Sequence, residues 1–61
     1  MQVKLGDRII IDDIEMTCFE VRENFSGITY TFVYFQCGEL KELRFAPGEL
    51  DALGAHKKEK P

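Results

Sequence analysis

The sequence is poor in the residues that carry most enzyme and metal chemistry. It has two cysteines, Cys18 and Cys37, and a single histidine, His56. The cysteines form no Cys-x-x-Cys element, so a zinc site built from these three residues is disfavoured, and both are interpreted as small apolar core residues. A nucleophilic cysteine needs a base within hydrogen-bond reach, and the one histidine lies in the C-terminal segment. We therefore expect no catalytic residues, no metal and no cofactor, and a protein that is not an enzyme.

Long apolar runs and clusters of positive charge are also missing. No apolar run approaches the roughly 20 residues that span a bilayer. Residues 1–7 lack the apolar h-region of a secretory signal, so we expect a cytoplasmic protein without a membrane partner. Residues 1–54 carry five Lys or Arg against ten Asp or Glu. Phosphates need clustered Lys and Arg, so this acidic balance weighs against nucleic-acid binding.

What the sequence does have is a run of β-branched and aromatic residues over positions 28–35, which is typical of a central strand. Turn formers lie on both sides of this run, at 24–27 and at Gly38-Glu39. One or two helical turns are expected between Pro47 and Gly54. The sequence thus predicts a mainly β fold, a small antiparallel meander of four to five strands with a short C-terminal helical turn. The long strands are expected over residues 14–23, 28–37 and 40–45, within one domain over 1–54 followed by a flexible basic tail over 55–61.

The two turns predict which side chains share a face of the sheet. They place Glu23 opposite Ile28, and Cys37 opposite Leu40. One face then becomes almost wholly apolar, and this agreement between turn chemistry and burial supports the register. We expect that face to form the core together with Ile9, Ile11 and the C-terminal leucines; its members are Phe19, Val21, Ile28, Tyr30, Phe32, Tyr34, Leu43 and Phe45.

The opposite face mixes apolar and charged side chains. A contiguous apolar patch rimmed by charge marks docking or self-association surfaces. The strong bend of long strands in a small barrel is the alternative, because it can bury part of a second face. In the docking interpretation the partner-binding residues are Met16, Cys18, Arg22, Val33, Phe35, Leu40 and Arg44.

Two further features are interpreted from the same register. In this register Cys37 lies opposite Ile14. Ile14 is four residues along its strand from Cys18, which is a distance of about 13 Å. Bridgeable cysteines need Cα atoms within about 7 Å, so two free thiols are expected. Phe25 at the loop tip is expected to fold back onto the sheet. The acidic residues Asp12, Asp13 and Glu15 are interpreted as a solvated cluster beside a turn rather than a cation site.

Three features together resemble SH3-like small β-barrels, including the Tudor-like and KOW-like accessory modules. They are the opening Leu5-Gly6-Asp7-Arg8 before a strand, the three-strand meander and the helical turn after the last long strand. The resemblance covers residues 3–53 and matches no specific family signature. It implies a fifth strand after the helical turn, where only residues 54–56 and a lysine tail remain.

Without a fifth strand, closure must come from residues 3–5, from a partner, or not occur at all. An open edge accepts a strand from another chain, and pairing would enlarge a small core, so a homodimer is expected. The expected function is a non-enzymatic protein-interaction module or a small regulatory or accessory subunit. The alternative implied by the Tudor/KOW resemblance is a nucleic-acid-binding accessory domain acting in transcription or translation. Its phosphate contacts would be Arg8, Arg22, Lys41, Arg44 and the tail lysines.

Overall fold

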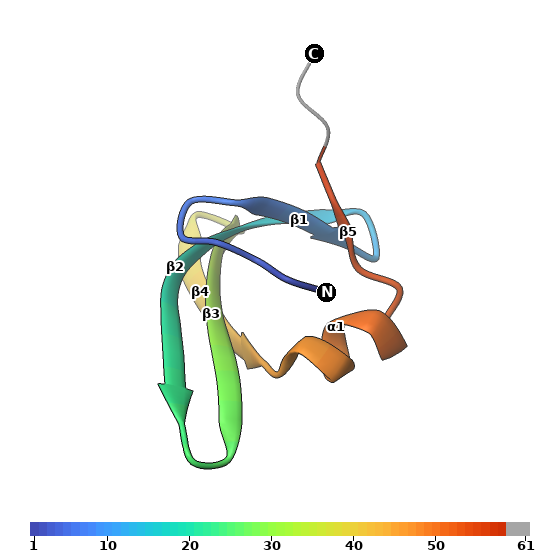
Figure 1. The fold of residues 1–61 in the computed structure, drawn as a ribbon. Helices are drawn as coiled ribbons and strands as arrows, with labels where there is room; N and C mark the ends of the chain where they lie inside the picture. Colours follow the sequence, from blue (N-terminus) through green and yellow to red (C-terminus); the bar gives the residue numbers. More distant parts are fainter. Residues whose placement is uncertain (59–61) are drawn as a thin grey trace.

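The computed structural model describes residues 1–58, which form one open five-stranded sheet and one short helix (Figure 1). All strand pairs are antiparallel, and the strand order is β4-β3-β2-β1-β5. The predicted mainly β fold with a short helical segment near the C-terminus is confirmed. The elements are β1 (Arg8–Ile11), β2 (Ile14–Asn24), β3 (Gly27–Gln36), β4 (Glu39–Phe45), α1 (Pro47–Ala52) and β5 (His56–Lys57).

A short fifth strand occupies part of the segment that was expected to be a free tail. His56 lies opposite Ile10, and Lys57 lies opposite Ile9. The Lys58 amide donates a hydrogen bond to the Arg8 carbonyl at 3.0 Å. These contacts satisfy backbone groups on the side of β1 that faces away from β2, so the structure places residues 56–58 at the edge of the sheet. The remaining tail residues, 59–61, lie outside the described part of the chain.

A bulge in β2 corrects the predicted register of the first hairpin. The predicted pairing holds from Glu23 opposite Ile28 as far as Glu20 opposite Thr31, but Cys18 then pairs with Phe32. The extra residue on β2 turns every earlier side chain to the other face. Met16 and Cys18 therefore point into the core and are 3% and 1% exposed. Both were expected on the opposite face, which mixes apolar and charged side chains, and this prediction is wrong.

The second hairpin is shifted by two residues from its predicted register. Leu40 lies opposite Phe35, and Gln36 lies opposite Glu39. The two-residue turn is Cys37-Gly38, whose φ angles of 52° and 78° are those of a type I′ turn. The predicted turn at Gly38-Glu39 is therefore wrong by one position. Because the shift is even, each β4 side chain still lies on the face that was predicted for it.

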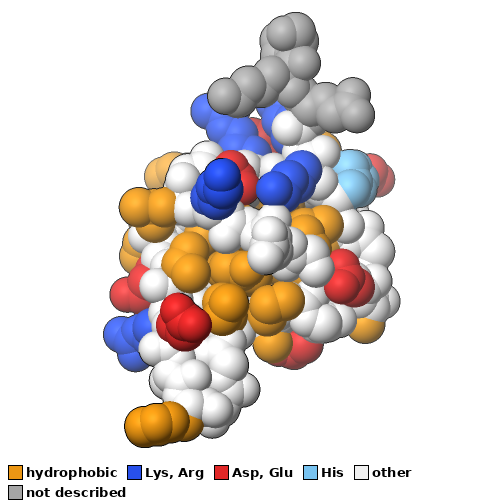
Figure 2. Space-filling model, in the orientation of Figure 1, with side chains coloured by type: hydrophobic (Ala, Val, Ile, Leu, Met, Phe, Trp, Pro, Cys, Tyr) orange, Lys and Arg blue, Asp and Glu red, His pale blue; other side chains and the backbone are white. Residues whose placement is uncertain are grey.

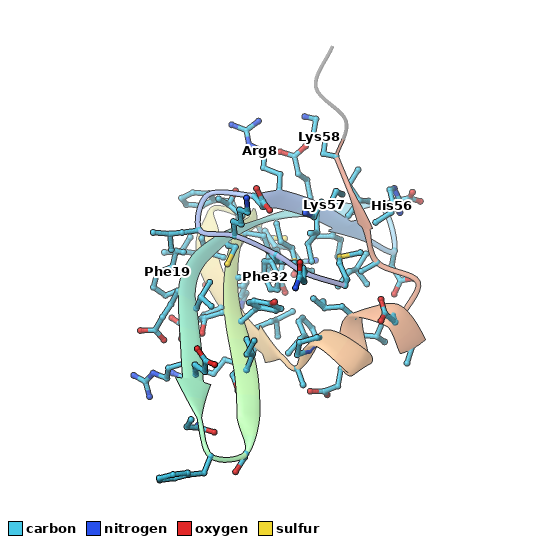
Figure 3. All side chains as sticks on the ribbon, viewed as in Figure 1. Arg8, Phe19, Phe32, His56, Lys57 and Lys58 are labelled. Atoms are coloured by element: carbon cyan, nitrogen blue, oxygen red, sulfur yellow. The ribbon has the colours of Figure 1, made fainter. Side chains whose placement is uncertain are left out.

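The core lies between the sheet, α1 and the N-terminal segment. Figure 3 shows Phe32 in the middle of this layer, and Leu50 of α1 is completely buried in the same core cluster. The N-terminal segment crosses the same face (Figure 1), and the Val3 amide donates a hydrogen bond to the Tyr30 hydroxyl at 3.2 Å. The buried apolar residues are Val3, Ile9, Ile11, Met16, Cys18, Tyr30, Phe32 and Leu50.

The predicted core is only partly covered. The hairpin of β2 and β3 projects beyond the rest of the chain (Figure 1), so little packs against its far half. Phe25 at the tip is fully exposed and does not fold back onto the sheet. Tyr34 and Phe45 are partly buried against the core. Five residues expected in the core are instead exposed by 36–47%: Phe19, Val21, Ile28, Leu43 and Leu53.

Candidate functional site

An apolar patch lies on the face of the sheet opposite the core. Phe35 of β3 and Leu40 of β4 lie directly opposite each other, and they are 77% and 60% exposed. Val33 is two residues back on β3, on the same face, and is partly buried. The type I′ turn directly beyond Phe35 and Leu40 holds the two strands in this register. We call Val33, Phe35 and Leu40 the outer patch.

Charged side chains border one side of the outer patch. Glu42 lies opposite Val33, and Arg44 lies opposite Thr31. The Arg44 guanidinium is 3.3 Å from the Glu42 carboxylate. An exposed ion pair of this kind contributes about 0–1 kcal/mol, so either group can turn towards a partner at little cost.

The structure brings together only part of the predicted partner-binding set. Val33, Phe35, Leu40 and Arg44 lie on neighbouring positions of β3 and β4. Arg22 is on the same face but pairs with Thr29, six residues along β3 from Phe35, which is about 20 Å of strand. Met16 and Cys18 do not reach this face because of the bulge in β2.

A hollow on the opposite face was not predicted from the sequence. It has a volume of about 290 Å³ and lies between the N-terminal segment, the β2–β3 hairpin and β5; its lining residues are Gln2, Val3, Lys4, Val21, Ile28, Tyr30 and Lys57. Figure 2 shows apolar side chains gathered at the centre of this face, with Lys or Arg side chains above them. The sequence assigned Val21 and Ile28 to the core, and no local signal shows that they stay 43% and 37% exposed. The volume is at the lower limit of small-molecule pockets.

Ion pairs join Lys57 of β5 and the next residue, Lys58, to carboxylates in the N-terminal part of the domain. The Lys58 ammonium is 2.7 Å from the Glu15 carboxylate, and the Lys57 ammonium is 3.4 Å from that of Asp7. Figure 3 shows Lys57, Lys58 and Arg8 at the same end of the molecule. The hydrogen bond from the Lys58 side chain lowers the pKa of Glu15. The pKa of Asp7 is also lowered, mainly because its carboxylate accepts a hydrogen bond from the Lys4 amide at 2.9 Å, with Lys57 adding to the effect.

Lys60 lies outside the described residues; the other basic residues that were expected to contact phosphates all have acidic neighbours. Each has a carboxylate oxygen within 4.0 Å in the described part of the chain. A phosphate would have to compete with these carboxylates, which adds to the unfavourable acidic balance of the chain. The pairs are Arg8–Glu15, Arg22–Glu20, Lys41–Glu39, Arg44–Glu42, Lys57–Asp7 and Lys58–Glu15.

The two thiols occupy different environments. Cys18 and Cys37 are both free, and only Cys18 lies in the core. Cys37 is exposed in the type I′ turn, so its interpretation as a core residue is wrong. Burial raises the pKa of the Cys18 thiol, and its sulfur donates a hydrogen bond to the Glu20 carbonyl at 3.6 Å. A buried thiol with a raised pKa is a poor nucleophile.

The acidic residues between β1 and β2 form a turn. Asp12 and Asp13 have φ angles of 50° and 65°, and they join the directly paired residues Ile11 and Ile14. Within residues 1–58, no group of three or more His, Cys, Asp or Glu side chains is placed to hold a metal ion.

Comparison with known proteins found no matching family model, no matching curated protein and no matching solved structure. Over the described residues, no helix has the length and apolar character needed to cross a membrane.

Proposed function

We propose that this chain is a non-enzymatic protein-interaction module that binds a protein partner through the outer patch. The observation that carries the proposal is the pairing of Phe35 with Leu40, two large apolar side chains that lie side by side and stay largely exposed. Aromatic side chains dominate the energetics of many interfaces because they bury a large area at a small cost in conformational entropy. The Glu42–Arg44 pair beside the patch would add specificity at its rim.

The state of the thiols supports a binding role rather than catalysis. Cys18 has a raised pKa and lies in the core, which is the opposite of an activated nucleophile. Cys37 is exposed in the β3–β4 turn, and His56 is exposed on β5. The exposed thiol and the histidine that could act as its base therefore lie on different elements. Free thiols are also compatible with the cytoplasmic location that we propose.

The strand order supports the proposed likeness to SH3-like accessory modules. That likeness implies a strand after the helical turn, and β5 follows α1 and pairs with β1. The sheet stays open, and β5 has only two residues. A role as an accessory subunit follows from this likeness, and we propose it together with the likeness.

Partner capture with matched variants tests the proposed function. The bait is the full chain as wild type, as Phe35→Glu and as Phe25→Glu, each incubated with lysate of the source cells, with and without nuclease. Phe25 is the matched control because it is equally aromatic and fully exposed, but it lies at the other hairpin. We expect a stoichiometric protein that survives nuclease, binds wild type and Phe25→Glu, and is lost with Phe35→Glu.

Two results would contradict the proposal. Equal capture by all three baits would show that the outer patch is not the binding surface. Loss of the partner set on nuclease treatment would favour the nucleic-acid alternative instead. Circular dichroism of each bait confirms that the variants are folded, which the exposure of Phe35 leads us to expect.

A further inference from the structure

β4 is an edge of the sheet that no other strand within residues 1–58 covers. It ends the strand order on one side, while the edge on the other side is the two-residue strand β5. Five of the seven residues of β4 are exposed, and its pairing with β3 is regular from Gln36–Glu39 to Tyr30–Phe45. The strand contains no proline. A long, regular, exposed edge is the part of a sheet that accepts a strand from another chain.

The turn between β3 and β4 determines which backbone groups of the edge are free. The residues that flank a two-residue turn, Gln36 and Glu39, exchange backbone hydrogen bonds. Alternate β4 residues from Glu39 onwards therefore direct their N–H and C=O groups to β3. The residues between them direct these groups outwards, away from the sheet; they are Leu40, Glu42 and Arg44.

The sequence of β4 is complementary to itself in two antiparallel registers. An axis at Leu40 places Glu39 opposite Lys41 but pairs only residues 39–41 of the strand, whereas an axis at Leu43 pairs residues 41–45. Pairing about a two-fold axis at Glu42 would place two glutamates face to face, and an axis at Lys41 would do the same with two lysines, which is unfavourable. An axis at Leu43 instead places Glu42 of one copy opposite Arg44 of the other, twice. These residues are the ones whose backbone groups point outwards, so the two pairs also exchange backbone hydrogen bonds.

The same register extends the apolar row on the core face. Phe32 is completely buried, and its neighbour Leu43 on β4 is 36% exposed. With the axis at Leu43, the row runs from Phe32 to Leu43, then to Leu43 and Phe32 of the second copy. The exposed side of Leu43 becomes covered, and two small cores join into one.

We propose that a second copy of this chain pairs with β4, edge to edge and antiparallel, with Leu43 at the two-fold axis. The occupant is a second copy because Glu42 and Arg44 alternate with the spacing that a two-fold axis between them requires. This proposal does not rest on the proposed function, since the outer patch and the edge share only Leu40 and the Glu42–Arg44 rim, and the pairing does not need Phe35.

Charge reversal at the edge tests the pairing. Light scattering at high micromolar concentration should give twice the chain mass of 7.0 kDa for the wild type. Glu42→Arg alone and Arg44→Glu alone place like charges opposite each other, so each should be monomeric. Their 1:1 mixture should form a heterodimer, and the double variant Glu42→Arg/Arg44→Glu should regain the homodimer.

Two controls separate the register from general charge and from the outer patch. Glu39→Arg changes the net charge as Glu42→Arg does, but it lies outside the proposed pairing, so it should remain dimeric. Phe35→Glu should also remain dimeric, so failure of partner capture and failure of self-pairing can be told apart. A wild-type monomer, or single variants that stay dimeric, would overturn the proposal.

Disulfide trapping tests the position of the axis. In a background with Cys37→Ser, Leu43→Cys places two cysteines opposite each other in a non-hydrogen-bonded pair, where Cβ atoms are close enough for a bond. Under mild oxidation, the Leu43→Cys variant should form a covalent dimer. Lys41→Cys in the same background should form none in the same time. Faster trapping through position 41 would show that the register is wrong.

Discussion

The Lys58 ammonium lies 2.7 Å from the Glu15 carboxylate, and the Lys58 amide donates to the Arg8 carbonyl at 3.0 Å. One lysine thus joins the end of the described chain to both β1 and β2. Together with the Lys57–Asp7 pair, it places the basic residues 57 and 58 against carboxylates of the acidic domain. The pairs are exposed, so their effect on stability is small, and the backbone pairing with β1 is what holds β5 at the edge.

These contacts predict a loss of stability in acid. The pKa values of Asp7 and Glu15 are lowered in the folded chain, so at a pH between the lowered and the ordinary values the unfolded state binds more protons than the folded state. Their stabilisation is present above the ordinary pKa values and is lost as the pH falls through the folded ones. We expect the urea midpoint of Asp7→Asn/Glu15→Gln to depend less on pH between 7 and 3 than that of wild type. High salt should reduce the difference between the two proteins at neutral pH, and identical pH profiles would contradict the assignment.

Truncation of two phenylalanines of β3 to alanine should change the unfolding free energy by very different amounts. Phe32 is completely buried, so Phe32→Ala should cost about 3–5 kcal/mol of unfolding free energy. That is comparable to the whole stability of a domain of this size, and the variant should be largely unfolded. Phe35→Ala should change the unfolding free energy by less than about 0.5 kcal/mol. Circular dichroism with urea denaturation measures both; an unfolded Phe35→Ala would place Phe35 in the core and remove the outer patch.

The two thiols should alkylate at different rates. Cys37 is exposed and Cys18 is 1% exposed with a raised pKa, so a native protein should take up one label quickly. Without reductant, the second label should appear only on addition of denaturant. Intact-mass analysis counts the labels, and Cys37→Ser should remove the fast one. A denatured protein that takes up no label would indicate a disulfide and contradict the predicted free thiols.

The turn at Cys37-Gly38 offers a stabilising substitution. Cys37 has a φ of 52°, a conformation that Asn adopts more readily than most residues, and Asn-Gly is favoured in type I′ turns. Cys37→Asn should raise the unfolding free energy by roughly 0.5–1 kcal/mol. Cys37→Ser is the matched control, since it removes the thiol without the preference of Asn. An equal gain in both variants would mean that the turn conformation is not the cause.

The local parts of the fold follow from the sequence. Turn formers at 24–27, the alternation along β3 and the Pro47–Gly54 pattern place the hairpins and the helix, because turn chemistry and a period of two are short-range properties. The core positions Ile9, Ile11, Tyr30 and Phe32 follow from the strand pattern, and Leu50 follows from the helical turn. The outer patch follows too, because an even shift of the second hairpin leaves the faces unchanged.

Only the tertiary structure decided the rest. The bulge that buries Met16 and Cys18 lies where the loop before β1 docks, with the Gly6 amide bonded to the Cys18 carbonyl and the Cys18 amide bonded to the Asp7 carbonyl, both at 2.8 Å. That contact joins residues more than ten positions apart, so no local pattern reveals it. The exposure of Val21 and Ile28 likewise depends on what covers the far half of the hairpin. An apolar side chain carries its preference for burial in the sequence, but whether it is buried depends on which distant segments pack against it.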